Sequence, residues 1–170
     1  GTALDDAVAG RTTRLGKLLG AMGVRYVVVA RSGAPLAFDK ARVEPPDSTV
    51  DALDQQLDLA RLSVSESLFI YDNAAFTPEV AQLPAGTLED SGDDLSAVLA
   101  ADLDQAKAVL PTGDRFVEGR GRLADESELY VARSRDANWH LAVGDATKEL
   151  QPAFGWAGRA EVSQGGRATL

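Results

Sequence analysis

The sequence predicts an α+β fold, in which a small α/β sheet unit packs with a C-terminal antiparallel β-sandwich of jelly-roll type. Two observations lead to this prediction. In the first part, an amphipathic helical pattern ends at a glycine and runs directly into an apolar β-branched segment. From residue 114 onward, short candidate strands follow one another at intervals of roughly 8–12 residues with turn residues between them, which is typical of a sandwich.

The first part contains a helix followed by a strand. Leu15, Leu18, Leu19 and Met22 recur at the spacing of one helical face, and Gly23 stands where a helix is expected to end. Residues 26–30 form an apolar run without alternation, which predicts a strand covered on both faces. A short helix that contains Val50, Leu53 and Leu57 is predicted next, capped by Ser48 or Thr49. Two strands over residues 59–64 and 68–71 complete this part.

The middle of the chain is predicted to connect two structured parts. Residues 76–94 contain prolines and glycines with little periodicity, and Asp93 and Asp94 then open a helix that extends to Leu110. We therefore divide the chain into an α/β unit (1–75), a linker with a connecting helix (76–113) and a β-sandwich unit (114–170). We expect the first and last units to share one core, because neither is large enough to stand alone.

The last part is predicted to be entirely β-structure. Trp139, Leu141 and Val143 alternate with polar or small residues, so this strand is expected to bury one face. Leu129 and Val131 alternate around Tyr130 in the same way. The predicted strands cover residues 115–118, 121–124, 128–134, 138–143, 149–153 and 159–163, with a final one from Arg167.

Composition excludes several classes of function. A net charge of −9 argues against nucleic-acid binding, which needs a surplus of Lys and Arg. No apolar run approaches the ~20 residues of a membrane span. With no cysteine and a single histidine, His140, the chain has no disulfide, no thiolate metal site and no His-based catalytic triad. The acidic residues between 89 and 94 lack the spacing of a calcium loop, so we expect no metal and no cofactor.

Aromatic residues are the best candidates for a binding site. Sugar-binding sites stack a sugar ring on an exposed aromatic face, while polar side chains hydrogen-bond the hydroxyl groups. The candidate glycan-binding residues lie close together in sequence: Arg135, Asn138, Trp139, His140, Phe154 and Trp156. The alternative is that both tryptophans belong to the core and that His140 is an ordinary strand residue. No catalytic residue is expected.

Three segments carry a resemblance to a known family. They are Gly-Val-Arg-Tyr-Val-Val-Val (23–29), Leu-Phe-Ile-Tyr-Asp-Asn (68–73) and Trp-His-Leu-Ala-Val-Gly (139–144), supported by residues 53–62, 154–157 and 165–170. Together they resemble the extracytoplasmic C-terminal regions of large multi-pass bacterial membrane glycosyltransferases, especially actinobacterial ones. In this chain Asp145 follows Gly144, whereas the family pattern often has Asp before Gly. In that family these motifs are structural rather than catalytic.

The resemblance implies a non-catalytic accessory domain on the extracytoplasmic face of the cell membrane. Its partners would be a cell-envelope polysaccharide or acceptor glycan and the membrane portion of the same polypeptide. Residues 164–170 resemble a turn that enters a strand, so we expect the chain to be a piece of something larger. Two alternatives stay open: a structural or protein-interaction module without a ligand, and a glycan hydrolase with two facing carboxylates, one of raised pKa.

Overall fold

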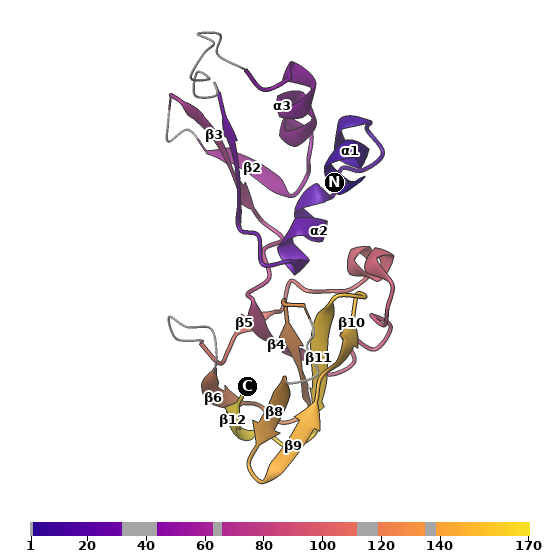
Figure 1. The fold of residues 1–170 in the computed structure, drawn as a ribbon, viewed down its shortest axis with the longest axis vertical. Coiled ribbons are helices and arrows are strands. Elements are labelled where there is room, and N and C mark those ends of the chain that lie inside the picture. The colour runs from indigo at the N-terminus through magenta and orange to yellow at the C-terminus, as the bar shows by residue number, and fades with distance from the viewer. Residues whose placement is uncertain (1, 32–43, 63–65, 112–118, 135–138) are drawn as a thin grey trace, which may run out of the picture. The chain divides into compact units, whose positions relative to one another are not determined.

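The computed structural model describes residues 2–31, 44–62, 66–111, 119–134 and 139–170. It divides into two compact units, one made of Gly1–Gly20 and Val24–Phe76, the other of Ala21–Gly23 and Thr77–Leu170 (Figure 1). Helices and antiparallel sheets are both present in the described residues, with sheet predominating. The predicted α+β class with a sandwich-like arrangement is confirmed.

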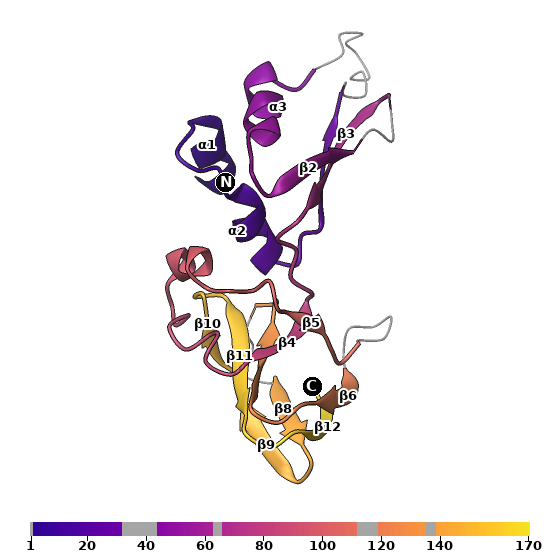
Figure 2. The same ribbon diagram turned by 180° about the vertical axis from the view of Figure 1, so that it is seen from behind.

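The first unit is an antiparallel three-stranded sheet with helices on one side. Its strands are β1 (Tyr26–Ala30), β2 (Leu59–Leu62) and β3 (Leu68–Asn73), in the order β1-β3-β2. The helices are α1 (Thr2–Val8), α2 (Leu15–Ala21) and α3 (Asp47–Asp54), and they lie on the same side of the sheet in both views (Figures 1 and 2). Between these layers lies a core cluster of buried residues: Ala7, Leu15, Leu53, Leu59 and Tyr71.

Helix α2 is held by side chains that are distant in sequence. The Asp58 carboxylate accepts hydrogen bonds from the backbone N–H groups of Gly16 and Lys17, at 2.9 and 2.8 Å. These are donors that the first turn of a helix leaves without a partner. Asn73 donates to the carbonyl of Gly16 at 2.8 Å, and a Cβ atom on Gly20 would lie 2.0 Å from the carbonyl oxygen of Ala75. The glycines of α2 therefore allow close packing on the end of β3.

The predicted helix before Gly23 is confirmed, and Gly23 has the positive φ (74°) expected after a helix end. The strands predicted over 59–64 and 68–71 correspond to β2 and β3, and residues 63–64 of the first lie outside the described residues. Helix α3 begins at Asp47, after Pro46, without a side-chain cap. The predicted cap by Ser48 or Thr49 is therefore wrong.

The prediction that strand β1 is covered on both faces is wrong for the described residues. The strand lies at an edge of the sheet, and its side chains alternate between half-buried and exposed. Val27 and Val29 pack on the core, whereas the Tyr26 and Val28 side chains are 50% and 54% exposed. An apolar run shows that both faces are apolar; it does not show that the described residues cover both.

The second unit is a sandwich of two antiparallel sheets. The five-stranded sheet has the order β10 (Gln151–Ala153), β11 (Ala157–Val162), β7 (Ser127–Val131), β4 (Val80–Pro84) and β5 (Lys107–Ala108). The four-stranded sheet has the order β6 (Arg120–Leu123), β12 (Gly166–Thr169), β8 (His140–Val143) and β9 (Ala146–Glu149). Their facing sides form one core cluster that includes Leu129, Val131, Ala160, Leu123 and Leu141.

Residues 77–111, most of the segment predicted as a linker, belong to the second unit, and two of its strands pair in the five-stranded sheet. β4 pairs with β7 along its whole length and with β5 on its other side. The predicted helix from Asp93 to Leu110 is wrong beyond its first turn, a 3-10 helix η1 (Leu95–Leu99). Its start is as expected, since the Asp94 side chain accepts from the N–H of Ser96. Farther on, the Asp102 carboxylate accepts from the N–H of Asp104, a local bond that competes with helix formation.

Strand β7 is covered on both faces, contrary to the one-faced prediction. Leu129 and Val131 face the sandwich core, and Tyr130 is equally buried on the other side. The Tyr130 hydroxyl donates to the carbonyl of Ala21 at 2.7 Å, and burial raises the pKa of this phenol far above its ordinary value. The central strand of this sheet is thus buried throughout.

The structure also differs from the prediction in which helices and strands are present. The structure adds α1, β4, β5 and β9, which the sequence did not predict, and the predicted strand 115–118 lies outside the described residues. Each unit has a core cluster of its own, and the shared core stays a prediction. Within the part of the chain that is described, no helix has the length and apolar character needed to cross a bilayer.

Candidate functional site

The aromatic residues proposed for glycan binding lie on different sheets. Trp139, just before β8, is half-buried against the sandwich core, and the guanidinium of Arg133 lies 5.5 Å from the centre of its ring. His140 is exposed on β8. Phe154 and Trp156 lie in the turn between β10 and β11 of the other sheet. Arg135 and Asn138 lie outside the described residues. The described candidates therefore come from two separate places.

Phe154 is a core residue. Its side chain is 1% exposed and its ring meets that of Tyr130 edge-on, with 5.9 Å between the centroids. Stacking on a sugar needs an accessible ring face, so the proposed role for Phe154 is not supported. Trp156 is half-buried, and its indole nitrogen is buried without a hydrogen-bond partner in the described part of the chain.

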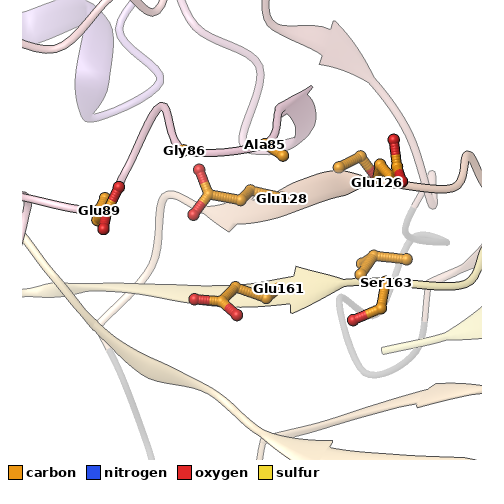
Figure 3. Close-up of a pocket in the computed structure, with 9 residues that line it drawn as sticks. Ala85, Gly86, Glu89, Glu126, Glu128, Glu161 and Ser163 are labelled. Carbon is orange, nitrogen blue, oxygen red and sulfur yellow. The ribbon is translucent and has the colours of Figure 1, made fainter.

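An acidic hollow of about 450 Å³ lies on the five-stranded sheet and the loop that follows β4. Figure 3 shows Glu128 and Glu161 on neighbouring strands, with Glu89 and Glu126 toward the two ends of the hollow. Ser127 and Ser163 also line it. The polar side chains of this lining are glutamates and serines, whose oxygen atoms can accept hydrogen bonds from the hydroxyl or ammonium groups of a ligand.

Glu128 already has partners inside the protein. Its carboxylate accepts from the backbone N–H of Leu88 at 2.7 Å and from the Arg159 guanidinium at 3.1 Å. The Glu128 side chain is 3% exposed, and its charge is paired with the largely buried Arg159. The hydrogen bond from Leu88 holds the loop after β4 against this strand. Glu161 stands directly opposite Glu128 in the β7–β11 register and is exposed. The carboxylates that a ligand would meet are therefore those of Glu89, Glu126 and Glu161.

The described residues contain no group of three His, Cys, Asp or Glu side chains arranged to hold a metal ion. In the acidic segment 89–94, Asp94 instead caps η1. Hydrogen bonds from the hydroxyl and backbone N–H of Ser96 lower the pKa of the Asp94 carboxyl.

A second candidate site is the side of the three-stranded sheet that faces away from α1, α2 and α3. The strand registers place Val28 opposite Ile70, and Ile70 opposite Leu62. We call this side the outer face; its residues are Tyr26, Val28, Ala30, Ala60, Leu62, Leu68, Ile70 and Asp72. It is apolar except for the Tyr26 hydroxyl and Asp72, and Tyr26, Val28 and Leu62 are 50%, 54% and 36% exposed.

The charges at this face compensate each other. Arg25 lies 3.8 Å from the Asp72 carboxylate, and its guanidinium lies 5.4 Å from the centre of the Tyr26 ring. Scattered apolar side chains on a surface need no explanation, but a contiguous apolar sheet face commonly marks an interaction site. The signal in the sequence is the apolar run Tyr-Val-Val-Val-Ala (26–30), in which both sets of alternating side chains are apolar.

Comparison of the chain with protein-family models, with curated proteins and with solved structures finds no match.

Proposed function

We propose that this chain is a non-catalytic extracytoplasmic accessory domain of a membrane glycosyltransferase, and that it works by packing against another part of the assembly. The outer face carries this proposal. A sheet that is apolar on both sides is expected to have both sides covered. In the first unit the helices cover one side, and Tyr26 and Val28 remain more than one-third exposed on the other.

The motif residues that suggested the family support a scaffold role. Tyr71 is buried in the core of the first unit, and its hydroxyl donates to the Asp54 carboxylate at 2.9 Å. Asn73 is buried and donates to the carbonyls of Gly16 and Val24, both at 2.8 Å. These side chains are engaged in holding the sheet and α2 together, so the motif is explained by folding rather than by chemistry on a substrate.

Fractionation of the native cells tests whether the protein is held at the extracytoplasmic face of the membrane. An antibody raised against this chain should detect the protein in the membrane fraction, and protease added to cells stripped of their outer wall should remove the signal. Detection in the cytosolic fraction, or protection from protease until the membrane is dissolved, would contradict the proposal. A cytoplasmic protein probed on the same blot controls for lysis.

Glycan contact is a second candidate function, supported by the acidic hollow. Its exposed acceptors, above all Glu161 and Glu126, are suited to sugar hydroxyl groups. Titration of the domain with cell-wall oligosaccharides, followed by backbone NMR shifts, should move signals around Glu161, and Glu161→Gln should weaken binding several-fold. Trp156→Ala is the matched variant for the site predicted from sequence. Shifts confined to the Trp156 turn would favour that site, and a flat titration would dismiss both.

The same oligosaccharides test the hydrolase alternative. Release of reducing ends by the wild-type domain, lost in Glu161→Gln, would establish a carboxylate-dependent activity. With the accessory role proposed here we expect no release above that of a buffer blank.

A further inference from the structure

We infer that the outer face of the three-stranded sheet binds an amphipathic α-helix, laid across β1, β3 and β2 with an apolar stripe against Val28, Ile70 and Leu62. This inference deepens the proposed function, because it names the kind of partner that the accessory domain packs against. Size, charge and the pattern of the sheet itself point to this occupant.

The size of the face fits one helix. Three strands about 4.8 Å apart, with about 3.3 Å per residue along each strand, make a patch of about 14 Å by about 17 Å. A helix with side chains is about 10 Å wide and rises about 1.5 Å per residue, so a segment of about 10 residues laid across the strands spans the dimension of about 14 Å. A stable interface between two proteins buries about 800 Å² on each side. The patch is well below that size, so two copies of this face make a poor dimer.

The charge on and around the outer face favours a protein helix over a lipid surface as its partner. Docking on an anionic membrane relies on surplus Lys and Arg beside the apolar patch. Here the one charged residue of the outer face, Asp72, is matched by Arg25 at its edge, and the chain as a whole carries a net charge of −9. The same net charge opposes self-association. An uncharged apolar stripe, with a polar residue near the Arg25 end, complements the face better than either alternative.

The opposite side of the same sheet shows what covers such a surface. Val27, Val29 and Phe69 alternate with the outer-face residues, have similar aliphatic or aromatic character, and pack on the cluster that α1, α2 and α3 help to form (Figure 2). Val28 is the same residue type as its inner neighbours Val27 and Val29. A helix on the outer face would complete a helix–sheet–helix arrangement, the usual solution for a sheet that is apolar on both sides.

Photo-crosslinking in the full-length protein, expressed in its own cells, tests the inference. A benzophenone amino acid at position 28 should give crosslinks whose mapped partner peptide has apolar residues at helical spacing. The matched control is position 57, in the same unit, where Leu57 is 72% exposed but lies off the outer face. A position-28 yield no higher than that at position 57, a crosslink to a second copy of residues 26–30, or a lipid adduct would each overturn the inference.

A variant separates loss of docking from loss of fold. With the crosslinker at position 62, Val28→Glu should reduce the crosslink yield about tenfold, because it places a charge against the apolar stripe. Leu57→Glu adds the same charge elsewhere and should leave the yield unchanged. Both variants should melt within a few degrees of the wild type, since both side chains are exposed. An equal effect of the two variants would contradict the inference.

The two proposals fail independently. If fractionation places the protein in the cytosol but position 28 still crosslinks to a helix, the membrane setting is wrong and the docking inference stands. If the protein is extracytoplasmic and position 28 behaves like position 57, the setting stands and the docking inference is wrong.

Discussion

Asn73 joins three segments of the first unit with one buried side chain. Its amide group donates to the carbonyls of Gly16 in α2 and Val24 before β1, and its amide oxygen accepts from the N–H of Ala75 at 3.1 Å. Buried backbone groups that lose such partners carry a full desolvation cost. At the scale of single residues, this side chain therefore contributes more to folding than its size suggests.

Replacing Asn73 by Ala should lower the free energy of unfolding by about 2–4 kcal/mol, because three hydrogen bonds worth about 1 kcal/mol each are lost and the part-buried Val24 carbonyl loses the Asn73 donor. Urea denaturation followed by circular dichroism measures the change. The control is Asp72→Ala, which removes a partly exposed ion pair and should cost less than about 1 kcal/mol. Similar losses for the two variants would contradict this role of Asn73.

The Tyr71 phenol is expected to make the free energy of unfolding depend on pH in the alkaline range. Burial, the hydrogen bond to Asp54 and the Asp54 charge raise the pKa of this phenol from 10.0 to about 12. Between these values the native state keeps the proton and the unfolded chain loses it, so the free energy of unfolding falls as pH rises through this window. Below pH 10.0 the contribution is fully present.

The test compares wild type and Tyr71→Phe by urea denaturation at several pH values across that window. The variant should lose stability less steeply with pH, while some slope remains because the pKa of Tyr130 is also raised. An unchanged slope in Tyr71→Phe would show that this phenol does not titrate as described.

At the scale of elements, strands β1 and β7 occupy positions in their sheets that differ from those their sequences indicate. β1 looks like a central strand because it is apolar throughout, yet it lies at an edge. β7 contains Ser127 and Glu128, yet it is central and buried because Glu128 finds Leu88 and Arg159 as partners. Local hydrophobicity reports which faces are apolar, and long-range pairing decides which are covered.

The turn between β10 and β11 is another element fixed from a distance. The N–H groups of Phe154 and Gly155 donate to the carbonyls of Ser91 and Gly92, at 2.8 and 3.0 Å. Gly155 has φ of 75°, and a Cβ atom there would lie 2.7 Å from the carbonyl oxygen of Asp93. Both the backbone conformation and the close approach require glycine.

Gly155→Ala should therefore cost about 3 kcal/mol or more, from left-handed strain of about 1–2 kcal/mol and a clash with backbone that cannot easily move. Gly144→Ala is a matched control, since Gly144 has φ of 57° in a hairpin turn and open space around its missing Cβ. It should cost only the strain. Thermal melts of the two variants measure the difference, and equal shifts would rule out the clash.

At the scale of the whole molecule, each of the two units has its own core cluster. The contacts of Asn73 belong to the first unit and those of Gly155 to the second. Substitutions without shared partners are expected to have additive effects on stability. The division into units therefore predicts that substitutions at Asn73 and Gly155 have additive effects on the free energy of unfolding.

The double variant Asn73→Ala/Gly155→Ala should lose the sum of the two single losses, within about 0.5 kcal/mol. Four-point denaturation series on wild type, both single variants and the double variant measure the coupling. A coupling free energy well above that value would show that the two sites depend on a shared structure.

The sequence alone determined the α+β class, the helix that ends before Gly23, strands β2 and β3 and most strands of the sandwich. Periodicity and glycine turns act over a few residues, so these features are local. It also identified the run that forms β1, but not that half of it would be exposed. The site residues were less predictable, because the sequence does not show that the Tyr130 ring packs on Phe154 and buries it.

Three features come from long-range packing: β4 belongs to the sandwich, Phe154 is a core residue, and Val28 and Ile70 lie on one apolar face. Each of these depends on a partner strand or loop tens of residues away, such as β7 for β4 and Tyr130 for Phe154. Burial is a property of that pairing, so it cannot be obtained from the hydrophobicity of the segment itself.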